Sequence, residues 1–413
     1  MKTRKSLPQG TNLRLLLDDC ECEKPFLYDY SSTKKAIAED IESVGFQFLT
    51  HTGHNFPEGG YTSAFILAES HVVVHTWPEH NHTVIIDISV CDFRRPNRDR
   101  TLNLGQRISH MFRPQKTVQE VLPMIPRLSD QVLPGQGYYV EINDLPAIRS
   151  SAHQEIMIAA TKPFGRALLI DGIFQTSEKE GFFYHEPLVH PPMLSHENPA
   201  HVLICGGGDG GAAWEVLKHP SVESCTIVEI DREVVDLCRQ ELPGVHRHAF
   251  DDPRVNIYIS DAYDFVKQCD AEFDVIVLDA TDPGAISQPL FSKEFYQAAH
   301  AILAKDGCLS LHTGAPLQPN EIRDAAVKAI PEIFTAVYPY MNFVPCYGTL
   351  LSYFMCFKGE GYIASPEEME RRLVQRGISD LRYLNQETYA ALFAIPPCLE
   401  SMFPTQKRDV LSK

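Results

Sequence analysis

The stretch Val202-Leu203-Ile204-Cys205-Gly206-Gly207-Gly208-Asp209-Gly210-Gly211 decides how the second half of the chain folds. An apolar run typical of a buried strand leads directly into a glycine-rich turn, and a helix-like stretch through Trp214 and Leu217 follows. A GxGxxG pattern between a strand and a helix is typical of ligand-binding turns, because its glycines let the backbone approach a bound ligand closely. The stretch therefore predicts a binding turn of the nucleotide type.

Further apolar runs surround this turn and alternate with helix-like stretches. They are Val202–Cys205, Thr226–Ile230, Val255–Ile259, Val275–Leu278 and Leu309–Leu311. Strands that are apolar throughout are typical of parallel sheets covered by helices on both faces. The pattern predicts an α/β, doubly wound, Rossmann-like domain.

Acidic residues stand where these runs end. Glu229 closes the second run, where a carboxylate can grip a ribose diol, and Asp279-Ala280-Thr281-Asp282-Pro283 follows the fourth. Ligands of such sheets bind at the carboxyl ends of the strands. Asp279 and Asp282 are therefore expected to line the same site as the glycine turn.

Asp209, inside the turn, indicates which ligand is bound. Its carboxylate would repel a pyrophosphate, so a dinucleotide is disfavoured and a cationic adenosyl compound such as a sulfonium is favoured. An alkylamine with a pKa of about 10.4 must lose a proton before it attacks such a compound, which costs about 4.6 kcal/mol at pH 7. A carboxylate of the Asp279 and Asp282 pair can take that proton while the other anchors an ammonium.

The first half of the chain has a different pattern. A helix-like stretch at Ser31–Val44 precedes alternating strands at Phe46–Thr50, Tyr61–Ala68, His71–His75 and Thr83–Val90, which predicts an α+β sandwich. Polar, proline-rich residues 100–138 are expected to be a linker, and residues 138–170 are expected to form short strands of a small β domain. The expected domains are residues 1–130, 131–195 and 196–413.

The segment Ala68-Glu69-Ser70-His71-Val72-Val73-Val74-His75-Thr76-Trp77-Pro78-Glu79 is unusual for a plain strand. Ser70 and His75 are an odd number of residues apart, so an unbroken strand would place them on opposite faces. A serine hydroxyl that attacks the preceding carbonyl gives an ester, and elimination then cuts the chain and leaves a pyruvoyl group. Such a ketone can act as an electron sink for decarboxylation. His75 suits the role of the base that assists ester formation and elimination. Cys91 suits the role of the acid that protonates the carbanion left by decarboxylation.

Composition limits the other possibilities. Of 413 residues, 37 are Lys or Arg and 54 are Asp or Glu, giving a net charge of −17. This charge disfavours binding to nucleic acid and fits cationic small substrates.

No apolar run reaches membrane-spanning length and no signal-peptide core follows Met1, so a cytoplasmic location is expected. The eleven cysteines show no CxxC pair and are interpreted as mostly reduced core residues. No carboxylate or cysteine completes a zinc spacing with the histidines of residues 51–82, so no metal is expected.

Residues 137–400 strongly resemble the spermidine synthase family of aminopropyltransferases. The resemblance rests on Phe164-Gly165-Arg166 through Leu169-Ile170-Asp171-Gly172, Tyr184-His185-Glu186, the GGGDGG turn, Val228-Glu229-Ile230-Asp231, Asp261, Asp279-Ala280-Thr281-Asp282-Pro283 and residues 383–397. It implies transfer of an aminopropyl group from decarboxylated S-adenosylmethionine to a diamine. The implied roles are Asp279 as proton acceptor, Asp282 as acceptor-amine anchor, Asp209 as anchor of the aminopropyl ammonium, Glu229 as ribose ligand and Asp261 as adenine ligand, with Gln154 and His185 lining the same pocket.

Residues 10–125 closely resemble prokaryotic S-adenosylmethionine decarboxylase through the Glu-Ser-His and His-Thr-Trp-Pro-Glu parts of the segment quoted above. The resemblance implies a cut between Glu69 and Ser70, a self-generated pyruvoyl group from Ser70, His75 as processing base and Cys91 as catalytic acid. It also implies a processing hydroxyl at Thr62 and an adenine-stacking ring at Phe56.

Departures from the synthase family cluster at the acceptor end of the pocket. His312-Thr313-Gly314-Ala315 replaces a segment that usually carries a Glu, and Pro345-Cys346-Tyr347-Gly348-Thr349-Leu350 keeps only the tyrosine of a Pro-Thr-Tyr-Pro-Ser-Gly loop. Ile286 replaces an adenosine-contacting proline. The donor half of the site is therefore expected to be intact and the acceptor half remodelled.

The sequence as a whole predicts a bifunctional polyamine enzyme whose first half makes the substrate of its second, with putrescine as the first-choice acceptor. Two alternatives remain: a pyruvoyl-dependent ornithine or arginine decarboxylase in the first half, or a non-catalytic regulatory domain. A methyltransferase would explain the turn and Glu229 but not the acid pair. At least a dimer is expected, because the first unit is short for a fold with two faces.

Overall fold

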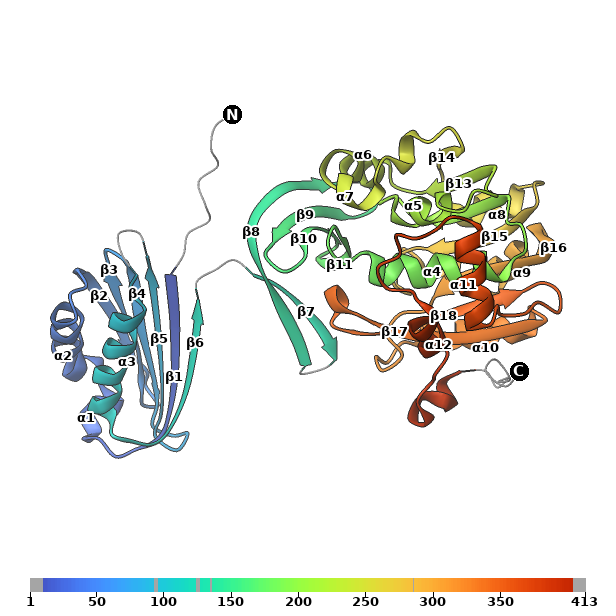
Figure 1. The fold of residues 1–413 in the computed structure, drawn as a ribbon. Coiled ribbons are helices and arrows are strands. Elements are labelled where there is room, and N and C mark those ends of the chain that lie inside the picture. The colour runs from blue at the N-terminus through green and yellow to red at the C-terminus, as the bar shows by residue number, and fades with distance from the viewer. Residues whose placement is uncertain (1–9, 93–95, 124–126, 134–135, 285, 404–413) are drawn as a thin grey trace. The chain divides into compact units, whose positions relative to one another are not determined.

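The computed structural model describes residues 10–92, 96–123, 127–133, 136–284 and 286–403 (Figure 1). The chain forms two compact units, residues 1–126 and residues 127–413. Among the described residues, no helix has the length and apolar content needed to cross a membrane.

The first unit is an antiparallel six-stranded sheet with helices packed on one face, as the α+β prediction required (Figure 1). Its strands run in the order β2-β3-β4-β5-β1-β6. They are β1 Gly10–Cys20, β2 Phe48–Asn55, β3 Tyr61–Leu67, β4 Ser70–Trp77, β5 Thr83–Cys91 and β6 Pro114–Pro123; the helices are α1 Lys24–Tyr28, α2 Tyr30–Ser43 and α3 Arg98–Phe112. Alternate strand residues and the inner helix faces form one apolar core.

The predicted linker at residues 100–138 is wrong over most of its length. Leu104, Ile108 and Phe112 are buried on α3 at helical spacing, and β6 pairs with β1 along the edge of the sheet. Polar residues on the solvent face of an edge strand and of an amphipathic helix gave this segment the composition of a linker. Residues 100–123 belong instead to the first unit, and residues 127–133 and 136–138 belong to strands of the second unit.

The second unit begins with a five-stranded antiparallel sheet in the order β11-β10-β9-β8-β7. Its strands are β7 Arg127–Leu133, β8 Gln136–Ser150, β9 Glu155–Thr161, β10 Gly165–Ile170 and β11 Ile173–Ser177. The end of β11 leads into helix α4 Phe182–Ser195, whose first turn carries Tyr184 and His185.

A seven-stranded mixed sheet follows, in the order β14-β13-β12-β15-β16-β18-β17. Its strands are β12 His201–Gly206, β13 Ser224–Glu229, β14 Val255–Ile259, β15 Phe273–Asp279, β16 Leu303–His312, β17 Ala336–Val344 and β18 Thr349–Phe357. The strands from β14 to β16 are parallel, while β17 and β18 pair antiparallel. The Rossmann-like prediction is confirmed.

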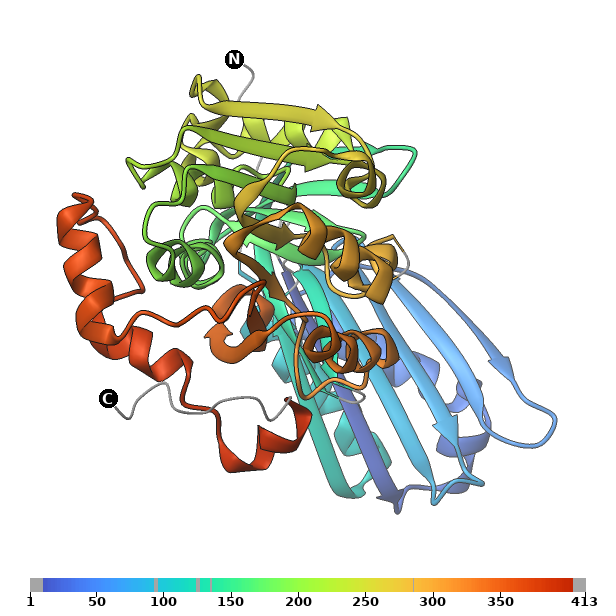
Figure 2. The same ribbon diagram turned by 90° about the vertical axis from the view of Figure 1, so that its right-hand side faces the viewer.

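Helices cover both faces of this sheet (Figures 1 and 2). They are α5 Gly211–Leu217, α6 Arg232–Glu241, α7 Pro243–His246, α8 Ala262–Gln268, α9 Lys293–Ile302, α10 Glu321–Ala329, α11 Pro366–Gln375 and α12 Gln386–Leu392. Val202 and Ile204 of β12 belong to the core on one face, and Leu203 and Cys205 belong to the core on the other. The alternation explains why the sequence of this strand is apolar throughout.

Candidate active sites

In the first unit, the backbone at the Glu69–Ser70 bond is strained. Residues 68–69 form the turn between β3 and β4, and Ser70, the first residue of β4, has a φ of 154°. A positive φ of this size is a region that side-chain-bearing residues rarely adopt. The interruption expected in this segment is thus found at Ser70 itself, and the strand runs unbroken from there to Trp77.

Two contacts polarise groups at this bond. The Cys91 backbone N–H donates to the Glu69 carbonyl oxygen at 3.0 Å. The Ser70 hydroxyl lies 3.1 Å from His71 Nδ1. An N–H donor at the carbonyl and an imidazole at the hydroxyl are the groups that an attack of Ser70 Oγ on this carbonyl needs.

His75 is not brought next to Ser70 within the chain. The two residues are five positions apart on an extended strand, roughly 16 Å at about 3.3 Å per residue. His75 Nδ1 instead lies 2.8 Å from the Thr62 hydroxyl, and its ring stacks on Trp77. It shares an open face of the sheet with His71, over a cavity that Arg14, Asp87 and Ser89 also line.

Phe56 follows the end of β2, and the residue is 44% exposed. The Cys91 carbonyl accepts a hydrogen bond from the buried Asn97 side chain at 2.8 Å. His71 and Asn97 were missed by the sequence analysis. His71 is the residue directly after the strained serine, which is the signal that could have identified it.

In the second unit, a backbone hydrogen bond joins the glycine turn to Asp279 at the end of β15. The Gly207 N–H donates to the Asp279 carbonyl at 2.8 Å. Gly206 has a φ of 86°, and a Cβ there would lie 2.1 Å from the Asp279 carbonyl oxygen. Only glycine permits this approach, which places the turn and Asp279 at one cavity.

The cavity contains every second-unit site residue that the sequence predicted except His185. It is lined by residues that include Gln154, Asp209, Glu229, Asp261, Asp279, Asp282, Ile286 and Tyr347. It lies at the carboxyl ends of β12, β13 and β15, where the strand order reverses. Tyr184 and His312 also line it, although neither was predicted. His312 ends β16 at the same edge, which is the signal that could have identified it.

The Asp279 carboxylate is buried, and only one of its two oxygens has a hydrogen-bond partner among the described residues. Its Oδ1 accepts a hydrogen bond from the Tyr184 hydroxyl at 2.7 Å, while Oδ2 is buried without a hydrogen-bond partner among the described residues. Burial, with the charge of Asp209, raises the pKa of Asp279 to about 6. A carboxylate with a raised pKa and a vacant oxygen can accept a proton from a bound amine.

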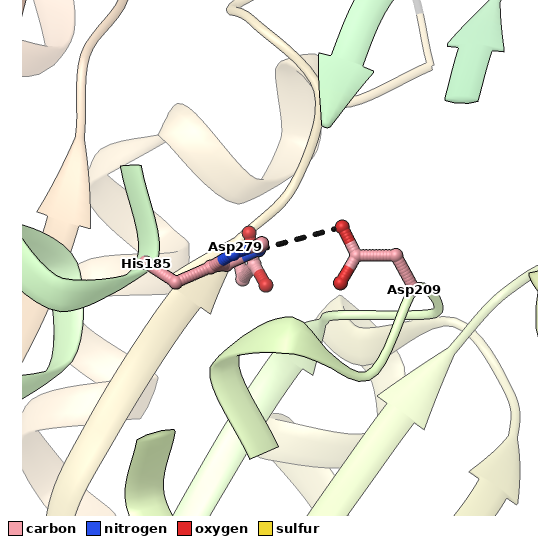
Figure 3. A group of neighbouring side chains, drawn as sticks. All are labelled: His185, Asp209 and Asp279. Atoms are coloured by element: carbon pink, nitrogen blue, oxygen red, sulfur yellow. Dashed lines mark ion pairs between the residues drawn. The ribbon is translucent and has the colours of Figure 1, made fainter. Parts of the chain in front are cut away.

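Asp209 and His185 form an ion pair across the cavity wall, with Oδ2 and Nε2 3.5 Å apart (Figure 3). Burial alone would lower the pKa of His185, but the Asp209 carboxylate outweighs it and raises the pKa to about 9. Burial would raise the pKa of Asp209, yet His185 and the Gly211 N–H, which donates at 2.6 Å, hold it below its usual value.

One ligand atom from each of His185, Asp209 and Asp279 lies within 4.8 Å of the others (Figure 3). A metal ion needs a neutral imidazole, whereas a pKa of about 9 keeps His185 protonated at neutral pH. Two buried carboxylates beside a protonated imidazole can also hold an organic ammonium group.

Backbone N–H groups hold the acids of the cavity that lie at the ends of β13 and β14. Glu229 accepts hydrogen bonds from the N–H groups of Gly208 at 3.2 Å and Asp231 at 2.9 Å, and burial raises its pKa to about 7. Asp261 caps α8 by accepting from the Tyr263 N–H at 2.8 Å. Gln154 donates to Asp231 at 3.1 Å.

Asp282 and His312 lie together in another part of the cavity wall. Asp282 is exposed, and its Oδ1 lies 3.5 Å from His312 Nδ1. His312 Nε2 donates to the Ala280 carbonyl at 2.7 Å, so Nδ1 faces the acid. Gly314 has a φ of 78°, and a Cβ there would lie 3.3 Å from Asp282 Oδ1. The Tyr347 hydroxyl donates to the Gln175 carbonyl, and its ring packs on Tyr184.

Three families match consecutive parts of the chain. Residues 13–119 match S-adenosylmethionine decarboxylase, residues 127–178 match the spermidine synthase tetramerisation domain, and residues 181–366 match the spermine/spermidine synthase domain. Both resemblances drawn from the sequence are confirmed. An S-adenosylmethionine decarboxylase domain and a spermidine synthase domain are both present.

Relatives of the second unit are similar over most of their own length. The polyamine aminopropyltransferase of Nitrosomonas europaea is 40% identical over 65% of this chain and 83% of its own. Polyamine aminopropyltransferase 1 of Pseudomonas aeruginosa is 38% identical over 67% of this chain and 96% of its own.

Solved structures agree with these relatives. A crystal structure of spermidine synthase in complex with the transition-state analogue AdoDATO has a TM-score of 0.63 and 35% identity, over 67% of this chain and 94% of its own. The spermidine synthase of Thermotoga maritima has a TM-score of 0.62 and 34% identity, over 68% of this chain and 94% of its own.

Proposed function

We propose that this chain, which belongs to the polyamine aminopropyltransferase family and also carries an S-adenosylmethionine decarboxylase domain, makes decarboxylated S-adenosylmethionine in its first unit and consumes it in its second. The product of the first reaction is the donor that the second requires. The acceptor is a diamine, with putrescine first, and the products are spermidine and 5′-methylthioadenosine.

The observation that carries the transfer reaction is the buried Asp279 carboxylate, whose Oδ2 has no hydrogen-bond partner among the described residues, beside the acid of the glycine turn. Asp279 takes a proton from the acceptor ammonium. The neutral amine then attacks the carbon next to the sulfonium, the carbon–sulfur bond breaks, and its electron pair stays on sulfur. Asp209 holds the ammonium of the donor, which fixes that carbon for attack.

The remaining residues bind the two substrates. Glu229 and Asp261 hold the ribose and adenine of the donor, Asp282 anchors the acceptor, and Gln154 and Tyr347 complete the pocket. His185 lies beside Asp209 and outside the cavity lining. The analogue bound by the similar spermidine synthase supports an adenosyl ligand here.

In the first unit, Ser70 Oγ attacks the Glu69 carbonyl carbon, and the Glu69–Ser70 amide bond breaks to give an ester. Elimination then releases the fragment that ends in the Glu69 carboxylate and leaves a dehydroalanine at residue 70. Water hydrolyses the imine tautomer of this dehydroalanine, which releases ammonia and leaves a pyruvoyl group at the new terminus. The strained φ of Ser70 and the Cys91 N–H on the Glu69 carbonyl support this step. The pyruvoyl ketone supplies an electron sink for loss of carbon dioxide, and Cys91 is the proposed proton donor.

The resemblance names His75 as the processing base, and the uncut chain adds His71 as the imidazole in contact with the Ser70 hydroxyl. The variants His71→Gln and His75→Gln separate the two roles. The variant that stays at full length on a denaturing gel identifies the base.

The test of the whole function is to incubate the purified chain with S-adenosylmethionine and putrescine and to identify the products by mass spectrometry. Spermidine, 5′-methylthioadenosine and carbon dioxide are expected together. Ornithine or arginine in place of S-adenosylmethionine should release no carbon dioxide, because Phe56 offers an adenine-stacking surface that neither amino acid uses.

We also propose a division into a decarboxylase-like domain at residues 1–130, a small β domain at 131–195 and a Rossmann-like catalytic domain at 196–413. The match to a tetramerisation domain supports a homo-oligomer. We also propose a cytoplasmic location, because eleven cysteines without a CxxC pair suit a reducing compartment.

A further inference from the structure

His185 forms a wall between two cavities. On one side lie Asp209 and Asp279 of the active-site cavity. On the other side His185 lines a second, smaller cavity, which the active-site cavity does not share. Arg247, Asp380 and Arg382 line this second cavity and are exposed, so it opens to solvent. His185 itself is 3% exposed.

The two ring nitrogens of His185 face different surroundings. Nε2 points toward Asp209 at 3.5 Å (Figure 3). Nδ1 lies beside Gly181, which lines the second cavity, since a Cβ on Gly181 would come within 3.4 Å of it. Gly211 makes room for the ring, because a Cβ there would lie within 2.6 Å of three ring atoms. One imidazole thus connects the active site with a separate route to solvent.

Charge in the active site changes when the proposed donor binds. Five acids line the active-site cavity, and two of them, Asp209 and Asp279, lie beside His185. The donor adds an ammonium, which the proposed function assigns to Asp209, and a sulfonium. The ammonium and the imidazolium would then lie beside one carboxylate in a buried site, where like charges repel strongly. The ammonium and the His185 imidazolium compete for the same carboxylate.

The acids that line the second cavity do not take over from Asp209 as the partner of the protonated His185 ring. The acids of the second cavity are Glu178, Glu186, Glu215 and Asp380, and the bases are Lys218, Arg247 and Arg382. Glu186 accepts three backbone N–H groups, from residues 382, 383 and 384. Glu215 is paired with His190 at 2.9 Å and Lys218 at 2.8 Å. Asp209 is therefore the main carboxylate that raises the pKa of His185, and Asp279 and Glu215 act in the same direction to a smaller extent.

We propose that His185 is a proton-release site coupled to donor binding: the donor ammonium replaces the imidazolium as the partner of Asp209, and the proton leaves from Nδ1 through the second cavity. No bond to carbon forms or breaks in this step, and one proton passes to water. The inference rests on the proposed function, because it takes the aminopropyl ammonium as the ligand of Asp209.

The affinity for the donor should then increase as the pH is raised. Because binding releases a proton, raising the pH favours the complex for as long as His185 is protonated in the free protein. The dissociation constant should fall about tenfold per pH unit in that range. A ligand without the ammonium should not show this dependence.

The experiment is calorimetric titration of the full chain at pH 8 in two buffers of different ionisation enthalpy, with decarboxylated S-adenosylmethionine and with 5′-methylthioadenosine. At this pH the groups with pKa values of about 6 (Asp279) and 7 (Glu229) are ionised, whereas His185, at about 9, is protonated. The donor should release about one proton per site. 5′-Methylthioadenosine shares its adenosine and lacks the ammonium, so it should release almost none.

His185→Gln should bind the donor without releasing a proton, while His248→Gln, at an exposed position outside both cavities, should behave as wild type. Donor binding to the wild type without proton release overturns the inference, as does His185→Gln releasing as much as wild type. Absence of donor binding to the wild type overturns the proposed function, and the inference with it. The comparison of the two ligands on wild type decides the question even if the variant does not fold.

Discussion

The Tyr184 hydroxyl donates to Oδ1 of Asp279 at 2.7 Å and leaves Oδ2 as the oxygen that can receive a proton. Tyr184 comes from the first turn of α4 and Asp279 from the end of β15, 95 residues apart. The contact holds the carboxylate in one orientation and leaves Oδ2 without a hydrogen-bond partner among the described residues. Because a hydrogen bond to the ionised form favours that form, it also opposes the rise in pKa that burial causes.

Replacing Asp279 by Asn should separate the two chemistries. The amide cannot accept the proton of the acceptor amine, so aminopropyl transfer should fall by about 10²- to 10⁴-fold. Carbon dioxide release from S-adenosylmethionine should stay at the wild-type rate, because Asp279 belongs to the second unit. Both rates are measured on one preparation, with decarboxylated donor supplied for the transfer assay. Loss of both activities in a folded variant would contradict independent sites.

Removing the Tyr184 hydroxyl should move the pH dependence of transfer. Asp279 acts as a base only when ionised, so transfer is lost as the pH falls through its pKa of about 6. Without the hydrogen bond that favours the ionised form, this pKa rises, and the acidic limb of kcat/KM should shift to higher pH in Tyr184→Phe. Tyr338→Phe, at a tyrosine that does not line the cavity, is the matched control. An unshifted limb in Tyr184→Phe would mean that Asp279 does not set it.

Cleavage of the first unit should depend on Ser70. The wild-type chain should give fragments of 69 and 344 residues on a denaturing gel and by intact mass. Ser70→Ala should stay at full length and release no carbon dioxide, yet keep aminopropyl transfer from supplied donor. Ser63→Ala, in the neighbouring strand, should still be cut. A wild-type chain that decarboxylates while uncut would refute the proposed processing.

The sequence predicted those parts of the fold and site that depend on local order along the chain. The strand, glycine turn and helix around Asp209, and the acid at the end of β15, follow from periodicity and from the carboxyl-edge rule. The contacts of Tyr184 with Asp279 and of His185 with Asp209 join residues far apart in sequence, so no local pattern predicts them. The linker prediction failed because composition alone does not distinguish a solvated edge strand from a loop.

The acceptor amine should be selected weakly, because the acceptor end of the cavity lacks a carboxylate at Gly314. Losing one charge-assisted contact costs about 1.5–3 kcal/mol, or roughly ten- to a hundredfold in binding. Asp282 remains, with His312 Nδ1 3.5 Å from its Oδ1, and can hold one ammonium. Agmatine and cadaverine should therefore react measurably beside putrescine. The test compares kcat/KM for the three amines at one pH and saturating donor, in wild type and in His312→Gln. Putrescine preferred a thousandfold by the wild type would show that another group replaces the missing carboxylate; if His312→Gln then lost that preference, the group would be His312.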